Sequence, residues 1–288
     1  MQVLLDQVAQ KKIGWDKFKK RVENPLNLSR LASKKELKTL LHLAVLEEQF
    51  DLIEKLKDEP FLKSRRDQFG LSPMDFAKLM NNKRAIAQLS PIQEGEPFSD
   101  FPPLPEFEYL NSPIFETKEQ MQEVIGIVAK AKNHDLIPSE KIWMGIYFDK
   151  EVRKGVHPPV SVRWVDSDVG YGVFANQKIT PCTFVGEYTG EVFQKSAKEL
   201  LEKRYCVRYT VWGGKKNFCI DAEKKGNFSR WINHSASPNL GLQSIYWRGI
   251  PRMVLISLKE IPEGSQLTFD YGTHFWKHHP QPPKKFEQ

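Results

Sequence analysis

The sequence predicts an α+β protein, with a helical N-terminal half and a C-terminal half built mainly from β-strands. Three observations support this fold class. Apolar residues recur at helical spacing upstream, six prolines fall between Pro91 and Pro113, and short β-branched and aromatic runs begin after Pro159. Apolar residues make up 40% and charged residues 27% of the 288 positions, which is typical of globular chains. This length allows two domains.

Composition excludes several classes of protein. No run of about eighteen apolar residues occurs, so we expect no membrane association, and the start of the chain lacks the pattern of a signal peptide. Three cysteines (Cys182, Cys206 and Cys219) are too few for a disulfide framework, which indicates a reducing, intracellular compartment. The net charge of +7 suits an acidic partner, but spread over 288 residues it gives little support to nucleic acid as a direct ligand.

Two stretches of the N-terminal half, residues 39–56 and 72–89, repeat with an offset of 33 residues. Thr39–Ala44 aligns with Ser72–Ala77, and the period and the first hexapeptide resemble the T-P-L-H-x-A pattern of ankyrin repeats. We therefore expect residues 1–90 to form a helical ankyrin-like repeat module, with the flanking N-terminal helices as a cap. A helical bundle with a chance repeat is the alternative.

The middle of the chain divides into two parts. Residues 91–116 are predicted to form an extended, proline-rich connector, because proline fixes φ and removes a backbone donor. We expect its aromatic residues to pin it onto a neighbouring surface; they are Phe98, Phe101, Phe107 and Tyr109. Residues 117–159 are predicted to be a helical segment, beginning with an amphipathic helix over 117–133.

Short strands separated by Gly, Asp and Asn turns are predicted in residues 160–276, and residues 277–288 form a short tail. The expected strands are Val160–Val165, Gly172–Ala175, Phe184–Tyr188, Phe218–Asp221, Met253–Ser257 and Leu267–Phe269.

Four segments of this half carry candidate functional residues: Gly170–Ala175, Glu187–Val192, Asp221–Asn239 and Leu267–Gly272. The Gly-x-Gly of the first lets the main chain approach a ligand, but no third glycine opens a helix, so it is not a dinucleotide fingerprint. Taken singly, the first two segments are compatible with a hairpin turn and a strand end. The third places polar donors and acceptors densely between apolar residues.

In this order and spacing, the four segments resemble the SET domain, a family of protein-lysine methyltransferases, over about residues 160–276. The Asn-His-Ser-x-x-Pro-Asn run at 233–239 and the Phe-Asp-Tyr-Gly run at 269–272 are its most specific elements. The resemblance implies a mostly-β fold with a pseudoknot, in which the segment 230–239 crosses the strand that ends at Tyr271.

The resemblance also implies the site. Its cofactor positions, which would hold S-adenosylmethionine, correspond here to Gly170, Tyr171, Gly172, Arg230, Asn233, His234, Tyr271 and Trp276. Its catalytic positions correspond to Tyr271 as the catalytic tyrosine, Tyr188 in the lysine channel, and Phe269 at the position that governs the number of methyl groups. A phenylalanine leaves space there, so we expect di- or trimethylation. Phe275 and Trp276 cover the cofactor adenine in this interpretation; core packing is the alternative.

The cysteine-rich modules of many family members are absent, so zinc and other metals are not expected. His274, His278 and His279 resemble a ligand cluster, but without an acidic or thiolate partner they are interpreted as a solvated tail.

The leading functional hypothesis is S-adenosylmethionine-dependent methylation of a lysine on a protein, a histone tail or other basic peptide being the substrate class that the family implies. The ankyrin-like module would dock a protein partner. A non-catalytic adaptor is the alternative, and a nucleic-acid binder is a third, weaker one. Because the chain is basic, a basic substrate requires acidic residues around the channel, with Glu187, Glu191 and Asp270 as candidates. Location is predicted as nucleus or cytoplasm, including a host nucleus if the chain is a bacterial effector.

Overall fold

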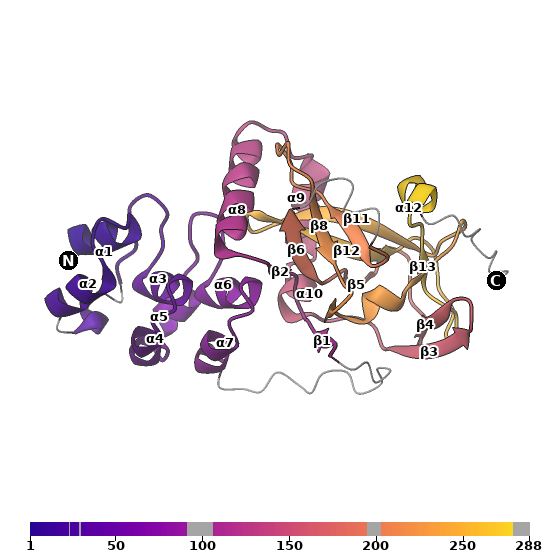
Figure 1. Ribbon diagram of the computed structural model, residues 1–288, viewed down its shortest axis with the longest axis horizontal. Helices are drawn as coiled ribbons and strands as arrows, with labels where there is room; N and C mark the ends of the chain where they lie inside the picture. Colours follow the sequence, from indigo (N-terminus) through magenta and orange to yellow (C-terminus); the bar gives the residue numbers. More distant parts are fainter. Residues whose placement is uncertain (23, 29, 91–105, 195–202, 279–288) are drawn as a thin grey trace. The chain divides into compact units, whose positions relative to one another are not determined.

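The computed structural model describes residues 1–22, 24–28, 30–90, 106–194 and 203–278. The predictions for residues 91–105, including Phe98 and Phe101, and for the tail from His279 onward lie outside the described residues. The chain divides into two compact units (Figure 1): Met1–Gly95 with Thr117–Met121, and Glu96–Glu116 with Gln122–Gln288. Within the described residues, no helix is long and apolar enough to cross a membrane.

The first unit is helical, as the sequence predicts. Its elements are α1 (Gln2–Ala9), α2 (Trp15–Arg21), η1 (Pro25–Leu28), α3 (Leu40–Leu46), α4 (Phe50–Leu56), α5 (Pro60–Ser64), α6 (Pro73–Leu79) and α7 (Lys83–Leu89). The bounds of α6 and α7 are those of α3 and α4 shifted by 33 residues. Helix α3 packs against α6, and α4 against α7. The repeat in sequence is therefore also a repeat of helix pairs.

The same period extends to the backbone of the connecting turns. Leu37 and Gly70, 33 residues apart, both have positive φ, at 55° and 97°. Glu48 and Asn81, again 33 apart, have φ of 53° and 48°. Left-handed backbone costs a side-chain-bearing residue about 1–2 kcal/mol, so its recurrence in register indicates that the two turns have the same geometry.

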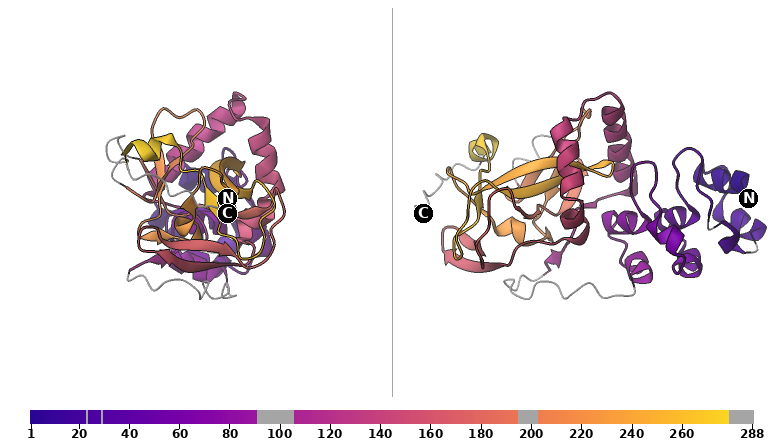
Figure 2. Two further views of the ribbon diagram at one scale, coloured as in Figure 1. Left: turned by 90° about the vertical axis from the view of Figure 1, so that its right-hand side faces the viewer. Right: turned by 180° about the vertical axis from the view of Figure 1, so that it is seen from behind.

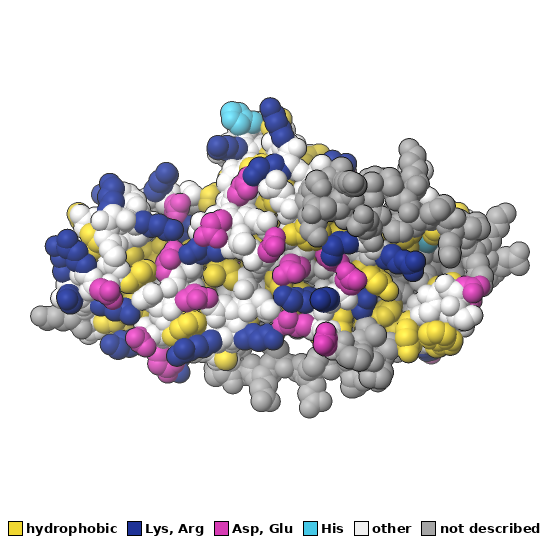
Figure 3. Space-filling model, in the orientation of Figure 1, with side chains coloured by type: hydrophobic (Ala, Val, Ile, Leu, Met, Phe, Trp, Pro, Cys, Tyr) yellow, Lys and Arg dark blue, Asp and Glu magenta, His cyan; other side chains and the backbone are white. Residues whose placement is uncertain are grey.

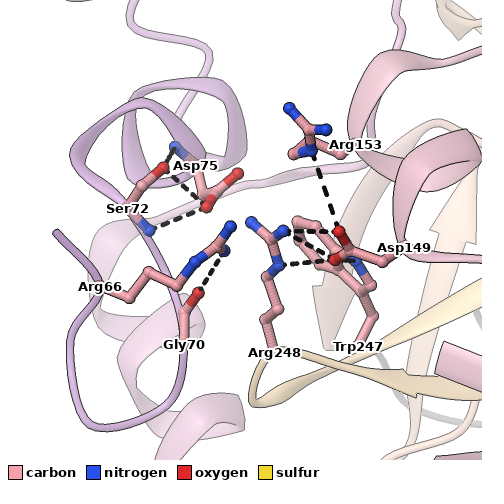
Figure 4. Close-up of polar contacts among 8 residues, drawn as sticks. All are labelled: Arg66, Gly70, Ser72, Asp75, Asp149, Arg153, Trp247 and Arg248. Carbon is pink, nitrogen blue, oxygen red and sulfur yellow. Dashed lines mark hydrogen bonds and ion pairs between the residues drawn. The ribbon is translucent and has the colours of Figure 1, made fainter. Parts of the chain in front are cut away.

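Matching caps begin the two repeats. Thr39 and His42 form a capping box at α3, and Ser72 and Asp75 form one at α6 (Figure 4). The His42 Nδ1 accepts from the Thr39 backbone N–H at 3.1 Å, so its proton lies on Nε2, which donates to the Leu71 carbonyl at 3.0 Å. His42 thus links the first repeat to the turn before the second. Complete burial lowers its pKa to about 4.

Helices α8 (Lys118–Asn133), α9 (Ser139–Tyr147) and α10 (Asp149–Lys154) follow. The amphipathic helix predicted over 117–133 is confirmed, and its predicted apolar side is buried: Met121, Val124, Ile125 and Val128. Helix α9 packs against β11 (Figure 2) at Gly145, where a Cβ atom would overlap the carbonyl of Tyr246.

Within the described residues, the strands of the second unit form four small sheets. Their strands are β1 (Glu108–Tyr109), β2 (Ile114–Phe115), β3 (Val160–Asp166), β4 (Gly170–Ala175), β5 (Phe184–Glu187), β6 (Glu191–Gln194), β7 (Cys206–Tyr209), β8 (Phe218–Asp221), β9 (Lys225–Gly226), β10 (Asn233–His234), β11 (Leu240–Trp247), β12 (Ile250–Ser257) and β13 (Thr268–Phe269). The strand orders are β1-β9, β10-β13-β11-β12-β5, β2-β6-β8-β7 and β3-β4.

The five-stranded sheet brings the two most specific sequence motifs together. Strands β10 and β13 pair in parallel, with Asn233 opposite Thr268 and His234 opposite Phe269. Strand β10, where the first motif begins, is an edge strand of this sheet, and β13 lies next to it; the core of this unit includes Trp231, Leu267 and Phe269. The pairing therefore positions the candidate site.

The described part of the predicted connector, residues 106–116, differs from an extended linker. It forms β1 and β2, which pair in parallel with β9 and β6 of the second unit. The physical reason is that backbone donors remain between the prolines. Glu108 donates to Lys224 at 2.9 Å, and Ile114 donates to Gly190 at 3.0 Å. Phe107 packs on Trp231 with ring centroids 5.5 Å apart, as a pinning residue would.

The β11–β12 hairpin is anchored to helix α10 by one carboxylate (Figure 4). Asp149 accepts from the Trp247 indole at 2.9 Å and from the Arg248 Nε at 2.8 Å. This contact holds the far end of the long hairpin.

Candidate functional site

A cavity of about 460 Å³ opens in the second unit between β7, β8 and the ends of β5 and β13. Four of the predicted site residues line it: Tyr188, Arg230, Phe269 and Tyr271. Its apolar wall includes Ile232, Leu242 and Met253. The sequence places these residues up to about 80 positions apart, and the sheet pairings bring them to one surface.

Tyr271 lies two residues after the end of β13 and forms two hydrogen bonds to the neighbouring segment. Its hydroxyl donates to the Ile232 carbonyl at 2.9 Å, and its backbone N–H donates to the His234 Nδ1 at 3.1 Å. Its ring packs on Phe269 and on Phe275, with centroids 4.9 Å and 4.8 Å away. Burial raises the pKa of Tyr271, so its hydroxyl is neutral at physiological pH.

Tyr188 follows β5 and is buried in the same cavity wall. Its hydroxyl donates to the Tyr205 carbonyl at 2.8 Å. Burial, together with the neighbouring Tyr271, raises the pKa of Tyr188 well above its usual value. Both tyrosine hydroxyls therefore donate their hydrogen bonds to backbone carbonyls. The hydroxyl oxygens of Tyr188 and Tyr271 remain able to accept a hydrogen bond from a ligand.

His234 is a neutral histidine between two rings. Its Nδ1 accepts the Tyr271 N–H, and its ring centroid lies 5.4 Å from that of Tyr271 and 4.8 Å from that of Trp276. Burial lowers its pKa, while Asp270, with an oxygen 3.5 Å from Nδ1, opposes this. Since Nδ1 is already an acceptor, the neutral form is the one that the geometry requires.

Arg230 lies in the cavity wall with only 9% of its surface exposed. Its guanidinium carbon lies over three rings, at 4.8 Å from Phe107, 4.2 Å from Tyr205 and 5.1 Å from Trp231. Cation–π contacts stabilise it there. Within the described residues, its Nε has no hydrogen-bond partner.

The remaining predicted residues form a second group outside the lining of the cavity: Gly170, Tyr171, Gly172, Asn233, His234 and Trp276. The Asn233 amide donates to the Tyr171 carbonyl at 3.0 Å, which joins β4 to β10. The His234–Tyr271 hydrogen bond connects this second group to the cavity.

Gly172 was expected to be a glycine so that a ligand could approach the main chain. The structure gives a different reason for the glycine. A Cβ atom there would meet the amide of Gln266, Val165 Cγ2 at 2.9 Å and Asn233 Nδ2 at 3.1 Å. Side chains of the protein itself, rather than a ligand, fill that space. At Gly170, where φ is 78°, a Cβ atom would meet nothing within 4 Å, and the turn conformation explains the glycine.

Two buried donors in or beside this second group have no partner within the described residues: the Trp276 Nε1 and the Nε2 of Gln266, which lies next to Gly172. Buried donors without an acceptor are rare, and they are expected where a ligand supplies the acceptor. Together with the ring of Trp276 against His234, these donors fit a ligand that carries acceptor atoms and an aromatic ring. S-adenosylmethionine is a ligand of this kind.

The acidic residues expected around the channel are mostly engaged elsewhere, which corrects the prediction. Glu187 is buried against Arg252, which also donates to the Ser112 hydroxyl at 3.0 Å. Burial raises the pKa of Glu187, and the guanidinium opposes this. Glu191 pairs with Lys225 at 3.3 Å. Of the three candidates, only Asp270 lines the cavity.

The cysteines are free thiols, and Cys206 and Cys219 line the cavity while Cys182 is exposed. No cluster of three or more His, Cys, Asp or Glu side chains suited to a metal occurs in the described part of the chain. On the face shown in Figure 3, basic and acidic side chains are interspersed over each unit.

Sequence reasoning missed Tyr205 and strand β7, although both border the cavity. The alternating run from Tyr205 to Tyr209 is a period-two signal that predicts a strand. No local signal indicates that the ring of Tyr205 and the ring of Phe107 flank Arg230, because this contact spans about 100 residues.

The part of the chain that contains this cavity is similar in sequence to known proteins. Residues 170–272 match the family model of the SET domain. The histone-lysine N-methyltransferase EHMT1 of Homo sapiens is 40% identical over 114 residues, which are 38% of this chain and 9% of that protein. SUV39H2 of Xenopus tropicalis is 33% identical over 132 residues, covering 43% and 32%. The histone-lysine N-methyltransferase ash1 of Drosophila melanogaster is 35% identical over 128 residues, covering 42% and 6%.

The matched part is thus a minority of this chain, and the chain spans less than a third of the length of these three relatives. A solved structure of a polycomb repressive complex 2 aligns with 42% of the chain at 29% identity, with a TM-score of 0.38 that is too low to compare folds. The second unit of this protein carries a SET domain with homology to histone-lysine methyltransferases.

Proposed function

We propose that this chain transfers a methyl group from S-adenosylmethionine to the side-chain amine of a lysine on a protein, with histones as the first substrates to test. The observation that carries the proposal is the single cavity lined by Tyr188, Phe269 and Tyr271 inside the region that matches the SET domain. SET methyltransferases use S-adenosylmethionine, and the relatives to which this chain is similar are histone-lysine methyltransferases.

The second group of site residues would hold S-adenosylmethionine. Asn233 and His234 would contribute main-chain and side-chain contacts, the donors of Gln266 and Trp276 would find acceptors, and Tyr171 would supply a ring. The bound cofactor supplies an electrophilic methyl group on a positively charged sulfur.

The cavity would prepare the lysine. A lysine with a pKa of about 10.4 must lose its proton, which costs about 4 kcal/mol at pH 7.4. The apolar wall around Phe269, Leu242 and Met253 disfavours the ammonium form and lowers that cost. The hydroxyl oxygens of Tyr188 and Tyr271 accept N–H bonds from the amine, which orients its lone pair for an in-line displacement.

Phe269 supports repeated methylation. Its ring is buried beside Tyr271 and brings no hydroxyl into the cavity. Because position 269 adds no further polar atom to hold a water or restrict the amine, a methylated amine can turn and present its lone pair again. We therefore propose the di- or trimethyl state as the product.

For the first unit we propose an ankyrin-like module that docks a protein partner. The support is the 33-residue shift of paired helices, repeated in caps and turn conformations. For the second unit we propose that residues 230–239 and β13 cross as a pseudoknot, supported by the parallel β10–β13 pairing. A histone substrate would place the protein in a nucleus, its own or that of a host.

Methyl transfer by the full-length protein tests the function. We would incubate it with tritiated S-adenosylmethionine, mixed histones and basic peptides, and identify products by mass spectrometry. We expect transfer by the wild type, and a loss of about a hundredfold or more in Tyr271→Phe, because one positioned hydroxyl is removed from the reacting amine.

Tyr147→Phe is the matched control, since Tyr147 lies on α9 with 78% exposure and outside the cavity. It should retain wild-type activity. Wild-type protein that neither binds S-adenosylmethionine in calorimetry nor methylates any protein would contradict the proposal and favour a non-catalytic adaptor.

A further inference from the structure

The charged residues that line the cavity are mostly basic. Among the described residues they are Lys203, Arg204, Arg208, Arg230 and Asp270. Four cations and one anion make this an unfavourable environment for a strongly basic peptide. Which of these charges can act on a substrate depends on the partners that they already have.

Two of the cations are already engaged. Lys203 forms an ion pair with Asp221 and lies 3.6 Å from a carboxylate oxygen of Glu223. Arg230 is buried among aromatic rings, as described above. The charge of Lys203 is therefore compensated by carboxylates, and the guanidinium of Arg230 is directed at rings of the protein itself rather than at a peptide.

The other two cations are available. Arg204 and Arg208 are exposed, and neither has a hydrogen-bond or ion-pair partner within the described part of the chain. Arg208 lies on β7, at the edge of its sheet, opposite Cys219 of β8. Residues paired in this way share a face, and Cys219 also lines the cavity, so the backbone directs Arg208 to the cavity side.

We propose that Arg204 and Arg208 select substrates that carry an aspartate or glutamate close to the methylated lysine. This inference rests on the proposed function and specifies its substrate class. A cavity of this volume is about 10 Å across, which an extended peptide spans in about three residues. The acidic side chain is therefore expected within about three positions of the lysine.

Asp270 does not cancel this preference. Its side chain is 61% exposed, and its carboxylate lies 3.5 Å from the Nδ1 of the neutral His234. One carboxylate and two guanidinium groups without a partner among the described residues line the same cavity, so the net charge offered to the substrate is positive. Arginine suits this role because its planar donors bind a carboxylate in two parallel hydrogen bonds.

Competing peptides test the inference. Three peptides would share one central lysine and differ only in having glutamate, glutamine or lysine at two flanking positions. We expect the glutamate peptide to have a kcat/KM about tenfold above the glutamine peptide, and the lysine peptide to be the poorest. Raising the salt concentration should narrow these differences, because exposed charges are screened.

Two variants sharpen the test. Arg204→Gln/Arg208→Gln should lose the preference, and Arg204→Glu/Arg208→Glu should reverse it in favour of the lysine peptide. Lys150→Glu is the matched control: Lys150 is exposed on α10 outside the cavity lining, and this variant should keep the wild-type preference.

The possible failures are distinguishable. Methylation of none of the peptides, together with no uptake of S-adenosylmethionine, would overturn the proposed function. Equal rates on the three peptides, or a glutamate preference that persists in both double variants, would overturn only the selection by Arg204 and Arg208.

Discussion

The two units of this chain differ in how far apart in sequence their stabilising partners lie. In the first unit, caps join residues three apart, and the link between repeats joins His42 to Leu71, 29 positions away. In the second unit, Glu187 meets Arg252 across 65 positions and Tyr271 meets His234 across 37. Local contacts make the first unit a repeat, whereas distant contacts build the cavity of the second.

Each unit nevertheless contains a neutral histidine whose Nδ1 accepts a backbone N–H. His42 receives it from Thr39 and His234 receives it from Tyr271. The first histidine has no exposed surface and acts only in packing, while the second borders the candidate site. The same chemical device thus stabilises a repeat in one unit and orients a catalytic candidate in the other.

The largest expected effect comes from breaking the distant ion pair of the second unit. Arg252→Leu leaves the Glu187 carboxylate buried without its partner, and we expect a loss of about 3–5 kcal/mol in the free energy of unfolding. Urea unfolding of the full chain measures it. Lys178→Met removes an exposed pair with Glu260 and should cost less than about 1 kcal/mol. Equal losses in the two variants would contradict the assigned role of the buried pair.

Acid should weaken the first unit by the next largest amount. The pKa of His42 falls from 6.5 to about 4 on folding, so the unfolded chain binds the proton more readily. The contribution of the neutral His42 to the free energy of unfolding is fully present above pH 6.5. It is lost as the pH falls towards 4, by about 3 kcal/mol in total.

Hydrogen exchange of the amides in 39–46, followed by mass spectrometry, reports this opening locally. His42→Gln should remove the pH dependence in this window. A wild-type exchange rate that rises no more than that of the variant between pH 6.5 and 4 would show that His42 is not the titrating group.

Adding a single hydroxyl to the cavity should have a smaller effect, limited to the number of methyl groups on the product. Phe269→Tyr places an oxygen beside Tyr271, which restricts rotation of a methylated amine. We expect the second methyl addition to slow by about tenfold, or about 1.4 kcal/mol, with the first addition little changed. Mass spectrometry of a time course resolves the products. Monomethyl product alone from the wild type would show that Phe269 does not permit repeated transfer.

The smallest effect concerns the second histidine. Protonation of His234 would remove the acceptor for the Tyr271 N–H, so activity should fall as the pH drops below the ordinary histidine range. Asp270 raises the pKa of His234, so Asp270→Asn should move the acid limb of kcat/KM to lower pH. A shift to higher pH would contradict this coupling.

The sequence predicted much of the fold because many signals are local. The helix over 117–133 follows from apolar residues three or four positions apart, and the paired helices in 39–56 and 72–89 follow from a repeat that is visible in the sequence. Strands β1 and β2 were missed for the opposite reason. Their partners, Lys225 and Glu191, lie about 80 to 120 positions away, so proline density dominated the local pattern.

The residues of the candidate site were identified by resemblance, and their contacts were not. The sequence indicated that Asn233, His234 and Tyr271 belong to one site. It did not indicate that Arg204 and Arg208 have no ion-pair partner among the residues that the structure describes, while Glu187 is paired with Arg252. Whether a charged side chain is available to a ligand depends on its ion-pair partners, and those partners are determined by the folded chain.

By itself, therefore, the sequence determined the helical repeat, the helix over 117–133 and the order of the motifs. Hydrogen bonds and apolar spacing within a few residues suffice for those features. Only the tertiary structure decided which hydroxyls and guanidinium groups face the cavity, and that Gln266 and Asn233 occupy the space at Gly172. These outcomes depend on parallel pairings such as β10 with β13, which join segments that share no local signal.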